Sequence, residues 1–177
     1  MFTNILIGIA VVVVLFVVVV ALRPGGFRVM RATSISAQPG VVFPLVNDFH
    51  NWDVWSPWAK LDPNMKQTFE GPSAGTGAIY SWLGDKKVGE GRMTILESRS
   101  DELVRIKLEF LKPFASTNTA EFTFRNQDNQ THVTWTMTGE CNFVFKAFGL
   151  FMNMDKMVGP DFEKGLAQMK AAAESAR

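Results

Sequence analysis

Cysteine, histidine and tyrosine are scarce in this sequence. Its 177 residues include one cysteine, Cys141, two histidines, His50 and His132, and one tyrosine. A lone cysteine cannot form an intrachain disulfide, so cysteine usage leaves the redox compartment open. Two histidines and one cysteine are also a poor set of ligands for zinc, and we expect no metal site.

Several motifs of cofactor and metal enzymes are missing as well. The chain has no HExxH or CxxC motif, no Walker loop and no GxGxxG turn. The short glycine pairs Gly75-Thr76-Gly77 and Gly89-Glu90-Gly91 are typical of turns and bulges at the starts of strands. We therefore expect no cofactor.

A strong charge of either sign is also absent. The chain has 18 basic and 17 acidic residues and a net charge of +1. No basic stripe interleaved with aromatic residues is present, which argues against a nucleic-acid partner.

The first prominent feature is an apolar run near the N-terminus. Residues Ile5–Leu22, ILIGIAVVVVLFVVVVAL, contain no charged side chain. Eighteen residues at ~1.5 Å each make a helix of roughly 27 Å, close to the thickness of the hydrocarbon layer. A signal peptide would have a basic start and a small-residue cleavage site, and a core helix would have a polar stripe. The run therefore favours a retained single-pass membrane anchor over both alternatives.

Basic residues lie on one side of this run only. Arg23, Arg28 and Arg31 follow it, and none precedes it. The positive-inside rule then predicts that the C-terminal part of the chain is cytoplasmic. Pro24-Gly25-Gly26 would end the helix and act as a hinge, so we divide the chain into an anchor, residues 1–26, and a second domain, residues 27–177.

Beyond the hinge, short runs of alternating polarity indicate strands. A short helix is expected from about Pro39 to Asn47, because Pro44 disfavours a strand there. The predicted strands are Phe27–Ser36, Thr76–Gly84, Gly89–Ser98, Leu103–Leu111, Ser116–Arg125 and His132–Cys141, with a weaker candidate at Lys66–Glu70.

The alternation also predicts which face of the sheet is buried. In the strand Leu103–Leu111, Val104, Ile106 and Phe110 share one side. The residues predicted to face inward in the next two strands are Asn118, Ala120, Phe122 and Phe124 in Ser116–Arg125, and Val133, Trp135 and Met137 in His132–Cys141. Clean alternation of this kind is typical of an antiparallel sheet with one solvated face. The C-terminal segment provides the cover, because Val158, Phe162, Leu166, Met169 and Ala173 recur at helical spacing.

This order of elements resembles the helix-grip fold of the Bet v 1/START-like superfamily. The local sequences resemble its polyketide cyclase/dehydrase-like branch of SRPBCC proteins. The similarity is carried by VVFPLVNDFHNWDVWSPWAKLDP, GTGAIYSW, LKPF, VTWTMTGE and MDKMVGPDFEKGLAQMK, and it extends from about Phe27 to Ala173. The expected class is α+β: a curved antiparallel sheet wrapped around a long C-terminal helix and preceded by one transmembrane helix.

The resemblance implies a cavity between the sheet and the C-terminal helix. Nine methionines and fifteen phenylalanines supply adaptable apolar walls for such a cavity. A solid core is the alternative for each single residue. The predicted ligand contacts are Trp52, Trp55, Trp58, Tyr80, Trp82, Phe110, Asn118, Phe122, Trp135, Met137, Phe162, Leu166 and Met169. Asn118, the Tyr80 hydroxyl and the indole nitrogens would orient the ligand.

Three tryptophans lie close together in the stretch VNDFHNWDVWSPWAKLDP. The favoured interpretation is packing: the rings anchor a connection without regular structure, and Asp48 or Asn51 caps short helical turns. A ligand gate comes second. Catalysis comes third, with Asp48, His50 and Asp53 as candidate proton acceptors.

We therefore expect a membrane-anchored protein that binds a hydrophobic small molecule such as a lipid, a quinone or a polyketide-like compound. A cyclase/dehydrase-type enzyme acting on an aromatic or polyketide-like substrate is the first alternative. A protein-interaction adaptor, as in the Hsp90-activator relatives of this fold, is the second. No particular protein partner is indicated.

Overall fold

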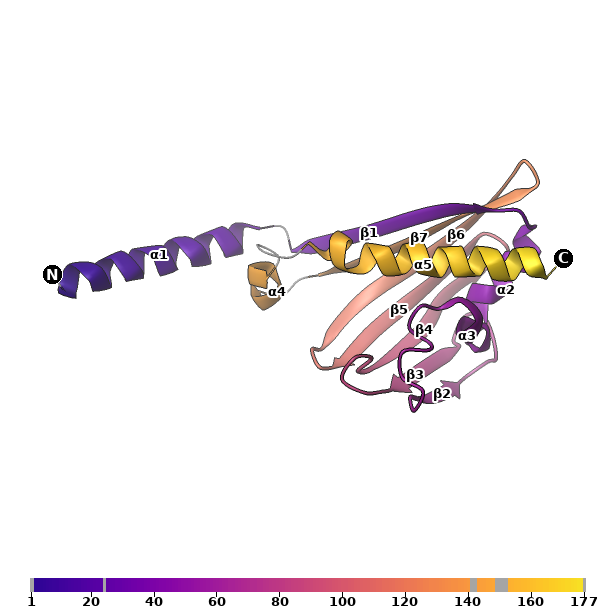
Figure 1. The fold of residues 1–177 in the computed structure, drawn as a ribbon, viewed down its shortest axis with the longest axis horizontal. Coiled ribbons are helices and arrows are strands. Elements are labelled where there is room, and N and C mark those ends of the chain that lie inside the picture. The colour runs from indigo at the N-terminus through magenta and orange to yellow at the C-terminus, as the bar shows by residue number, and fades with distance from the viewer. Residues whose placement is uncertain (1, 24, 141–142, 149–152, 177) are drawn as a thin grey trace.

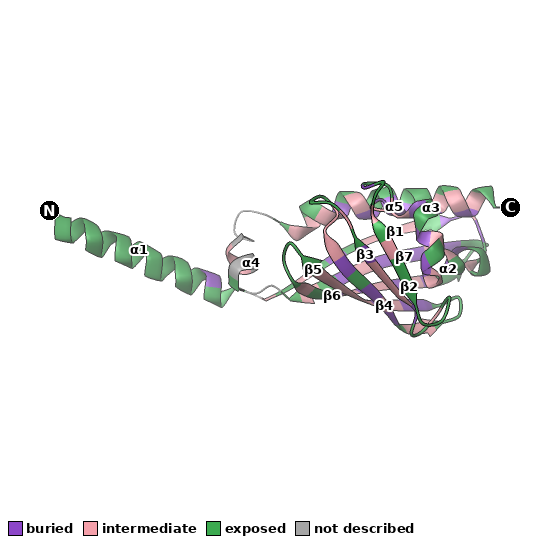
Figure 2. Ribbon diagram, turned by 90° about the horizontal axis from the view of Figure 1, so that it is seen from below, coloured by how far each residue is buried: buried purple, intermediate pink, exposed green. Residues whose placement is uncertain are grey.

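The computed structural model describes residues 2–23, 25–140, 143–148 and 153–176. Helix α1, Phe2–Leu22, extends away from the rest of the molecule (Figure 1). Its side chains are exposed along almost the whole length, and Val20 is the buried exception (Figure 2). By length and composition, α1 is the one helix among the described residues that could cross a membrane.

The remaining chain is built on one antiparallel sheet of seven strands, in the order β1-β7-β6-β5-β4-β3-β2. The strands are β1 (Gly26–Ile35), β2 (Lys66–Glu70), β3 (Ile79–Leu83), β4 (Glu90–Arg99), β5 (Leu103–Lys112), β6 (Ser116–Gln127) and β7 (Gln130–Glu140). Each predicted strand is present. The strand expected from Thr76 begins later, at Ile79, because Gly75 and Gly77 adopt positive φ angles that form a turn.

The sheet curves around helix α5, Met154–Ser175 (Figure 1). Four of the five residues predicted for the apolar face of α5 are buried: Phe162, Leu166, Met169 and Ala173 are each at most 2% exposed. The fifth, Val158 near the start of the helix, is only half-buried. On the sheet, the alternate residues of β6 and β7 that the sequence predicted to face inward are also buried. This is the helix-grip arrangement that the resemblance implied.

One ion-pair cluster fixes the start of α5 against β1. The Arg31 guanidinium lies 2.7 Å from a carboxylate oxygen of Asp155 and 2.6 Å from one of Glu163. Gly159 leaves room for the guanidinium at this crossing, because a Cβ there would force the arginine side chain to shift. These paired carboxylates raise the pKa of Arg31, and the Arg31 hydrogen bond lowers the pKa of Asp155.

The connection between β1 and β2 contains α2 (Pro39–Asn47), a 3₁₀ turn (Phe49–Asn51) and the short helix α3 (Trp52–Trp55). The tryptophan stretch was expected to be irregular apart from short helical turns, and the three-residue 3₁₀ turn and the four-residue α3 are such turns. The capping prediction is confirmed for Asp48, whose carboxylate accepts a hydrogen bond from the backbone N–H of His50. It is wrong for Asn51, which makes no side-chain cap.

A further short helix, α4 (Phe143–Phe148), was not predicted, and it contacts α1. The predicted last residue of β7, Cys141, lies outside the described residues.

Candidate ligand-binding cavity

A cavity of about 300 Å³ lies between the sheet, the α2–β2 connection and α5. Nine of its described lining residues are aromatic and four are methionines. Its size falls at the lower end of the range of roughly 300–1,000 Å³ that small-molecule pockets occupy. The apolar lining suits a small molecule with little polar surface.

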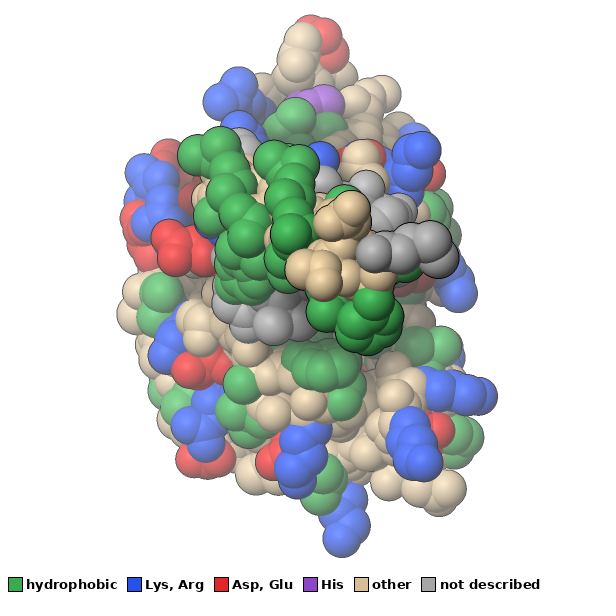
Figure 3. All heavy atoms as spheres, turned by 90° about the vertical axis from the view of Figure 1, so that its left-hand side faces the viewer, with side chains coloured by type: hydrophobic (Ala, Val, Ile, Leu, Met, Phe, Trp, Pro, Cys, Tyr) green, Lys and Arg blue, Asp and Glu red, His purple; other side chains and the backbone are tan. Residues whose placement is uncertain are grey.

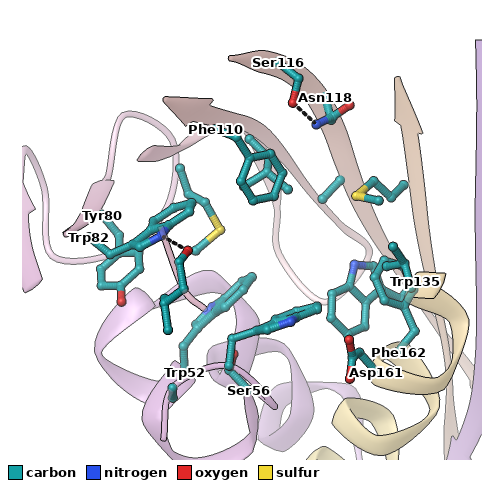
Figure 4. A pocket seen from close by; sticks show the side chains of 18 of the residues that line it. Trp52, Ser56, Tyr80, Trp82, Phe110, Ser116, Asn118, Trp135, Asp161 and Phe162 are labelled. Atoms are coloured by element: carbon teal, nitrogen blue, oxygen red, sulfur yellow. Dashed lines mark hydrogen bonds between the residues drawn. The ribbon is translucent and has the colours of Figure 1, made fainter. Parts of the chain in front are cut away.

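Two pairs of aromatic side chains form opposite walls (Figure 4). Tyr80 and Trp82 lie stacked on β3, with ring centroids 5.9 Å apart. Across the cavity, the indole of Trp135 on β7 stacks against Phe162 on α5, with centroids 3.8 Å apart and planes within 7°. Because these walls come from different elements, the cavity depends on the docking of α5 against the sheet.

Polar atoms are sparse in the lining. Asn118 on β6 is only 6% exposed, and its amide nitrogen donates a long hydrogen bond of 3.4 Å to the Ser116 hydroxyl. Three carboxylates also line the cavity: Asp53, Glu140 and Asp161. None of the described lining residues is Lys, Arg or His.

Tyr80, the single tyrosine of the sequence, brings a phenol into the lining. Burial raises the pKa of its phenol to about 12, and the nearby Asp53 carboxylate adds to the shift because it disfavours a second negative charge. The phenol is therefore neutral at physiological pH and can donate or accept a hydrogen bond.

Nine of the thirteen predicted ligand contacts line this cavity. They are Trp52, Trp58, Tyr80, Trp82, Phe110, Asn118, Trp135, Met137 and Phe162. The other four, Trp55, Phe122, Leu166 and Met169, are buried in the core and are not among the described lining residues.

Most indole nitrogens are already hydrogen-bonded to the backbone. Trp52 donates to the carbonyl of Val46 at 3.0 Å, and Trp55 donates to that of Leu45 at 2.7 Å. Trp82 donates to the carbonyl of Val88 at 3.3 Å. These three bonds fasten the rings in place and use up those three donors. The buried indole nitrogen of Trp135, which also lines the cavity, has no hydrogen-bond partner among the described residues, so the orienting role predicted for the indoles stays open for Trp135.

The three candidate proton acceptors are separated. Asp53 lines the cavity, whereas Asp48 and His50 are not among its described lining residues. Asp48 Oδ1 lies 2.7 Å from Nδ1 of His50, and the imidazole stacks on Phe69 with centroids 4.1 Å apart. Asp48 and His50 therefore form a local surface pair, while Asp53 alone of the three could reach a bound molecule.

The loop after β2 contains the pattern Gly71-Pro72-Ser73-Ala74-Gly75, which matches GxSxG. In hydrolases of that type the serine sits on a sharp turn between a strand and a helix. Here the pattern joins two strands, β2 and β3, and Ser73 is exposed. The local structure therefore does not form a nucleophile elbow.

Several lining residues were missed by sequence reasoning. Phe27 lies at the start of β1 and Glu140 at the end of β7. At strand ends, the alternation does not show whether a side chain reaches the cavity. Met65 comes from the irregular chain before β2, and Asp161 lies one residue beside the predicted apolar face of α5. These residues can be identified only when the position of α5 across the sheet is known.

Solved structures with the same fold are numerous, although their sequences are distant. The match to protein CV1439 from Chromobacterium violaceum has 15% identity and a TM-score of 0.59, and it covers 86% of this chain and 99% of that one. The Aha1 dimer from Colwellia psychrerythraea matches with 13% identity and a TM-score of 0.60, covering 84% and 96%. Ara h 8.0201 matches with 10% identity and a TM-score of 0.56, covering 86% and 97%.

No curated protein matches the sequence. One family model does match, over residues 27–174, and its description is "Polyketide cyclase / dehydrase and lipid transport". This match spans most of the chain and coincides with the sheet, the cavity and α5. The chain therefore belongs to the polyketide cyclase / dehydrase and lipid transport family.

Proposed function

We propose that this protein binds a hydrophobic small molecule in the cavity beneath α5, and that α1 anchors it to a membrane. The observation that carries the proposal is the aromatic and methionine lining of the cavity of about 300 Å³. This volume favours one ring-bearing molecule, or the end of a longer lipid, over a whole two-chain lipid.

A binding role fits the lining better than catalysis does. Acid–base catalysis needs a positioned proton donor or acceptor, normally oriented by a second group. Asp53 lines the cavity and accepts a hydrogen bond of 3.4 Å from Gln67, but the Asp48–His50 pair is not in the described lining. A cyclase/dehydrase activity would therefore have to work without this histidine.

Helix α1 supports the membrane part of the proposal. It is 21 residues long and carries no charged side chain, and its side chains are exposed rather than packed in a core. Such a surface is stable in lipid and costly in water. The arginines that follow α1 favour a cytoplasmic domain, although Arg31 is held by Asp155 and Glu163.

The end of the domain that adjoins α1 is also partly apolar. Leu111 and Phe114, at the β5–β6 connection, are 51% and 67% exposed, and Phe143 of α4 is 48% exposed. Figure 3 views this end along α1: hydrophobic side chains, those of α1 among them, lie near its centre, and basic and acidic side chains lie around the margin. Exposed apolar side chains at this end are suited to the interface of a bilayer.

Native mass spectrometry of the full chain and of the fragment 27–177 would test the binding role. We expect each to retain an apolar compound that organic extraction releases at a stoichiometry near one. An empty protein that also fails to take up lipids, quinones and aromatic probes would contradict the proposal.

Cell fractionation would test the anchor separately. The full chain should remain in the membrane fraction after a carbonate wash, and the fragment 27–177 should not. Release of the intact chain, or cleavage of α1 in the mature protein, would contradict a retained anchor.

A further inference from the structure

The side chains around the cavity restrict the electrical charge of its ligand. We infer that the cavity selects an uncharged molecule that carries a carbonyl or hydroxyl group, that Asn118 binds this group, and that carboxylate ligands are rejected. This inference rests on the proposed binding function and adds a ligand class to it.

The first step concerns charge. An ionised ligand group loses its hydration on entering an apolar cavity, and it must then be paired with an opposite charge or with several hydrogen bonds. No described lining residue is Lys, Arg or His. The charged lining residues are Asp53, Glu140 and Asp161, and all three are acidic. A bound carboxylate would find no counter-ion among the described lining residues. The three acidic side chains are exposed or half-buried, so water screens their repulsion and the missing counter-ion is the main effect.

The second step concerns the polar contact. The Asn118 side chain is 94% buried, being only 6% exposed, and it lies in the lining beside apolar residues. A primary amide has two N–H donors and one carbonyl acceptor. Within the described part of the chain, the one side-chain hydrogen bond recorded for Asn118 is the 3.4 Å bond to Ser116 (Figure 4). The second N–H and the carbonyl oxygen of Asn118 are therefore available to a ligand.

The third step concerns how the amide is accommodated. Asn118 faces Gly139 across the β6–β7 ladder. A Cβ at Gly139 would collide with Asn118 Oδ1 and would also press on the Phe27 ring. The glycine thus leaves room for a buried amide at a position where an apolar side chain would otherwise complete the core.

Three bicyclic probes of nearly equal shape separate these effects: naphthalene, 2-acetylnaphthalene and 2-naphthoate. The ketone and the carboxylate differ by the exchange of a methyl group for a charged oxygen. Binding would be measured by calorimetry on the full chain in lipid nanodiscs, with empty nanodiscs of the same composition as the blank. Because the three probes share the naphthalene ring system, the free energy gained by burying that ring system is nearly the same for each.

We expect 2-acetylnaphthalene to bind at least about tenfold more tightly than 2-naphthoate at neutral pH, because the carboxylate has no partner in the cavity. In the variant Asn118→Leu, which is close to Asn in shape, the preference for the ketone over naphthalene should fall by roughly threefold to tenfold, the net effect of one hydrogen bond.

The outcomes distinguish this inference from the function on which it rests. Equal affinity of the wild type for the ketone and the carboxylate would overturn the charge selection and leave the binding function standing. An unchanged ketone preference in Asn118→Leu would overturn the role of Asn118. The charge comparison needs only the wild type, so it stands even when the variant fails to fold. Failure of all three probes and of every other apolar compound would overturn the binding function and this inference together.

Discussion

The Trp135 and Phe162 rings lie parallel, with centroids 3.8 Å apart, and they join strand β7 to helix α5. One ring belongs to the sheet and the other to the helix, so this contact bridges the two layers of the fold. The same rings line the cavity. Stability and ligand binding therefore depend on a shared contact.

Replacing Phe162 should loosen the docking of α5. Phe162 is 1% exposed, and we expect Phe162→Ala to lower the free energy of unfolding by roughly 3–5 kcal/mol. Met157→Ala is the matched control, because Met157 lies on the same helix but is 52% exposed, and its replacement should change stability by at most about 0.5 kcal/mol. Urea denaturation followed by tryptophan fluorescence measures both. Similar losses in the two variants would contradict the bridging role of Phe162.

Alkaline titration should report directly on the cavity. Tyr80 is the only tyrosine, so the phenolate absorbance comes from this residue alone. Its pKa is raised from 10.0 to about 12, and the folded state therefore holds a proton that the unfolded chain releases. Stability should fall as pH rises from about 10 to about 12.

In the folded protein the phenolate signal should have its midpoint near pH 12, and Asp53→Asn should move that midpoint to a lower pH. Tyr80→Phe should abolish the signal. A midpoint near pH 10, while circular dichroism still shows a folded chain, would be evidence against a buried phenol.

The ion pair between Arg31 and Asp155 should make the stability of the protein depend on pH in acid solution. Arg31 lowers the pKa of Asp155 below its ordinary value of 3.8. The stabilisation is therefore complete above the ordinary pKa, and it is lost as pH falls through the lowered value in the folded state.

The variant Asp155→Asn should show a smaller loss of stability between neutral pH and the region below pH 3.8 than the wild type does. Asp128→Asn, in the β6–β7 turn, is a suitable control because Asn tolerates the positive φ found there. If the free energy of unfolding falls equally with decreasing pH in the wild type and in Asp155→Asn, that result would count against a stabilising ion pair.

The apolar end of the domain should bind lipid even without α1. We expect the fragment 27–177 to associate weakly with vesicles, and Leu111→Ser to reduce that association. Leu96→Ser is the matched control: Leu96 is 50% exposed and Leu111 is 51% exposed, but Leu96 lies on β4 away from this end. Vesicle flotation compares the three proteins. Equal losses in both variants would assign the effect to general hydrophobicity.

The fold was largely predictable because its strands alternate cleanly and α5 has one apolar face. The alternation of Val133, Trp135 and Met137, for example, correctly assigned the inward face of β7. Helix α4 was missed because Phe143–Phe148 is six residues long and lacks a polar periodicity that would distinguish a helix from a strand.

The cavity was less predictable than the fold, since alternation gives the face of a residue and not the space in front of it. Trp52 and Trp55 lie three residues apart and are both buried, yet only Trp52 is in the described lining. Both rings pack on Phe122, but Trp55 also packs against Trp135 at a centroid distance of 5.6 Å. That difference depends on how α3 sits against the sheet, which is a long-range property.

The short link between α1 and the sheet has a consequence for transport. Helix α1 ends at Leu22 and β1 begins at Gly26, so three residues connect them. At ~3.3–3.6 Å per residue, these three residues span only about 10 Å. A domain tethered so closely to a spanning α1 would sample the solute concentration of the lipid leaflet rather than that of bulk water. It also could not carry its ligand to a distant acceptor, so any exchange partner would have to meet it at the same bilayer.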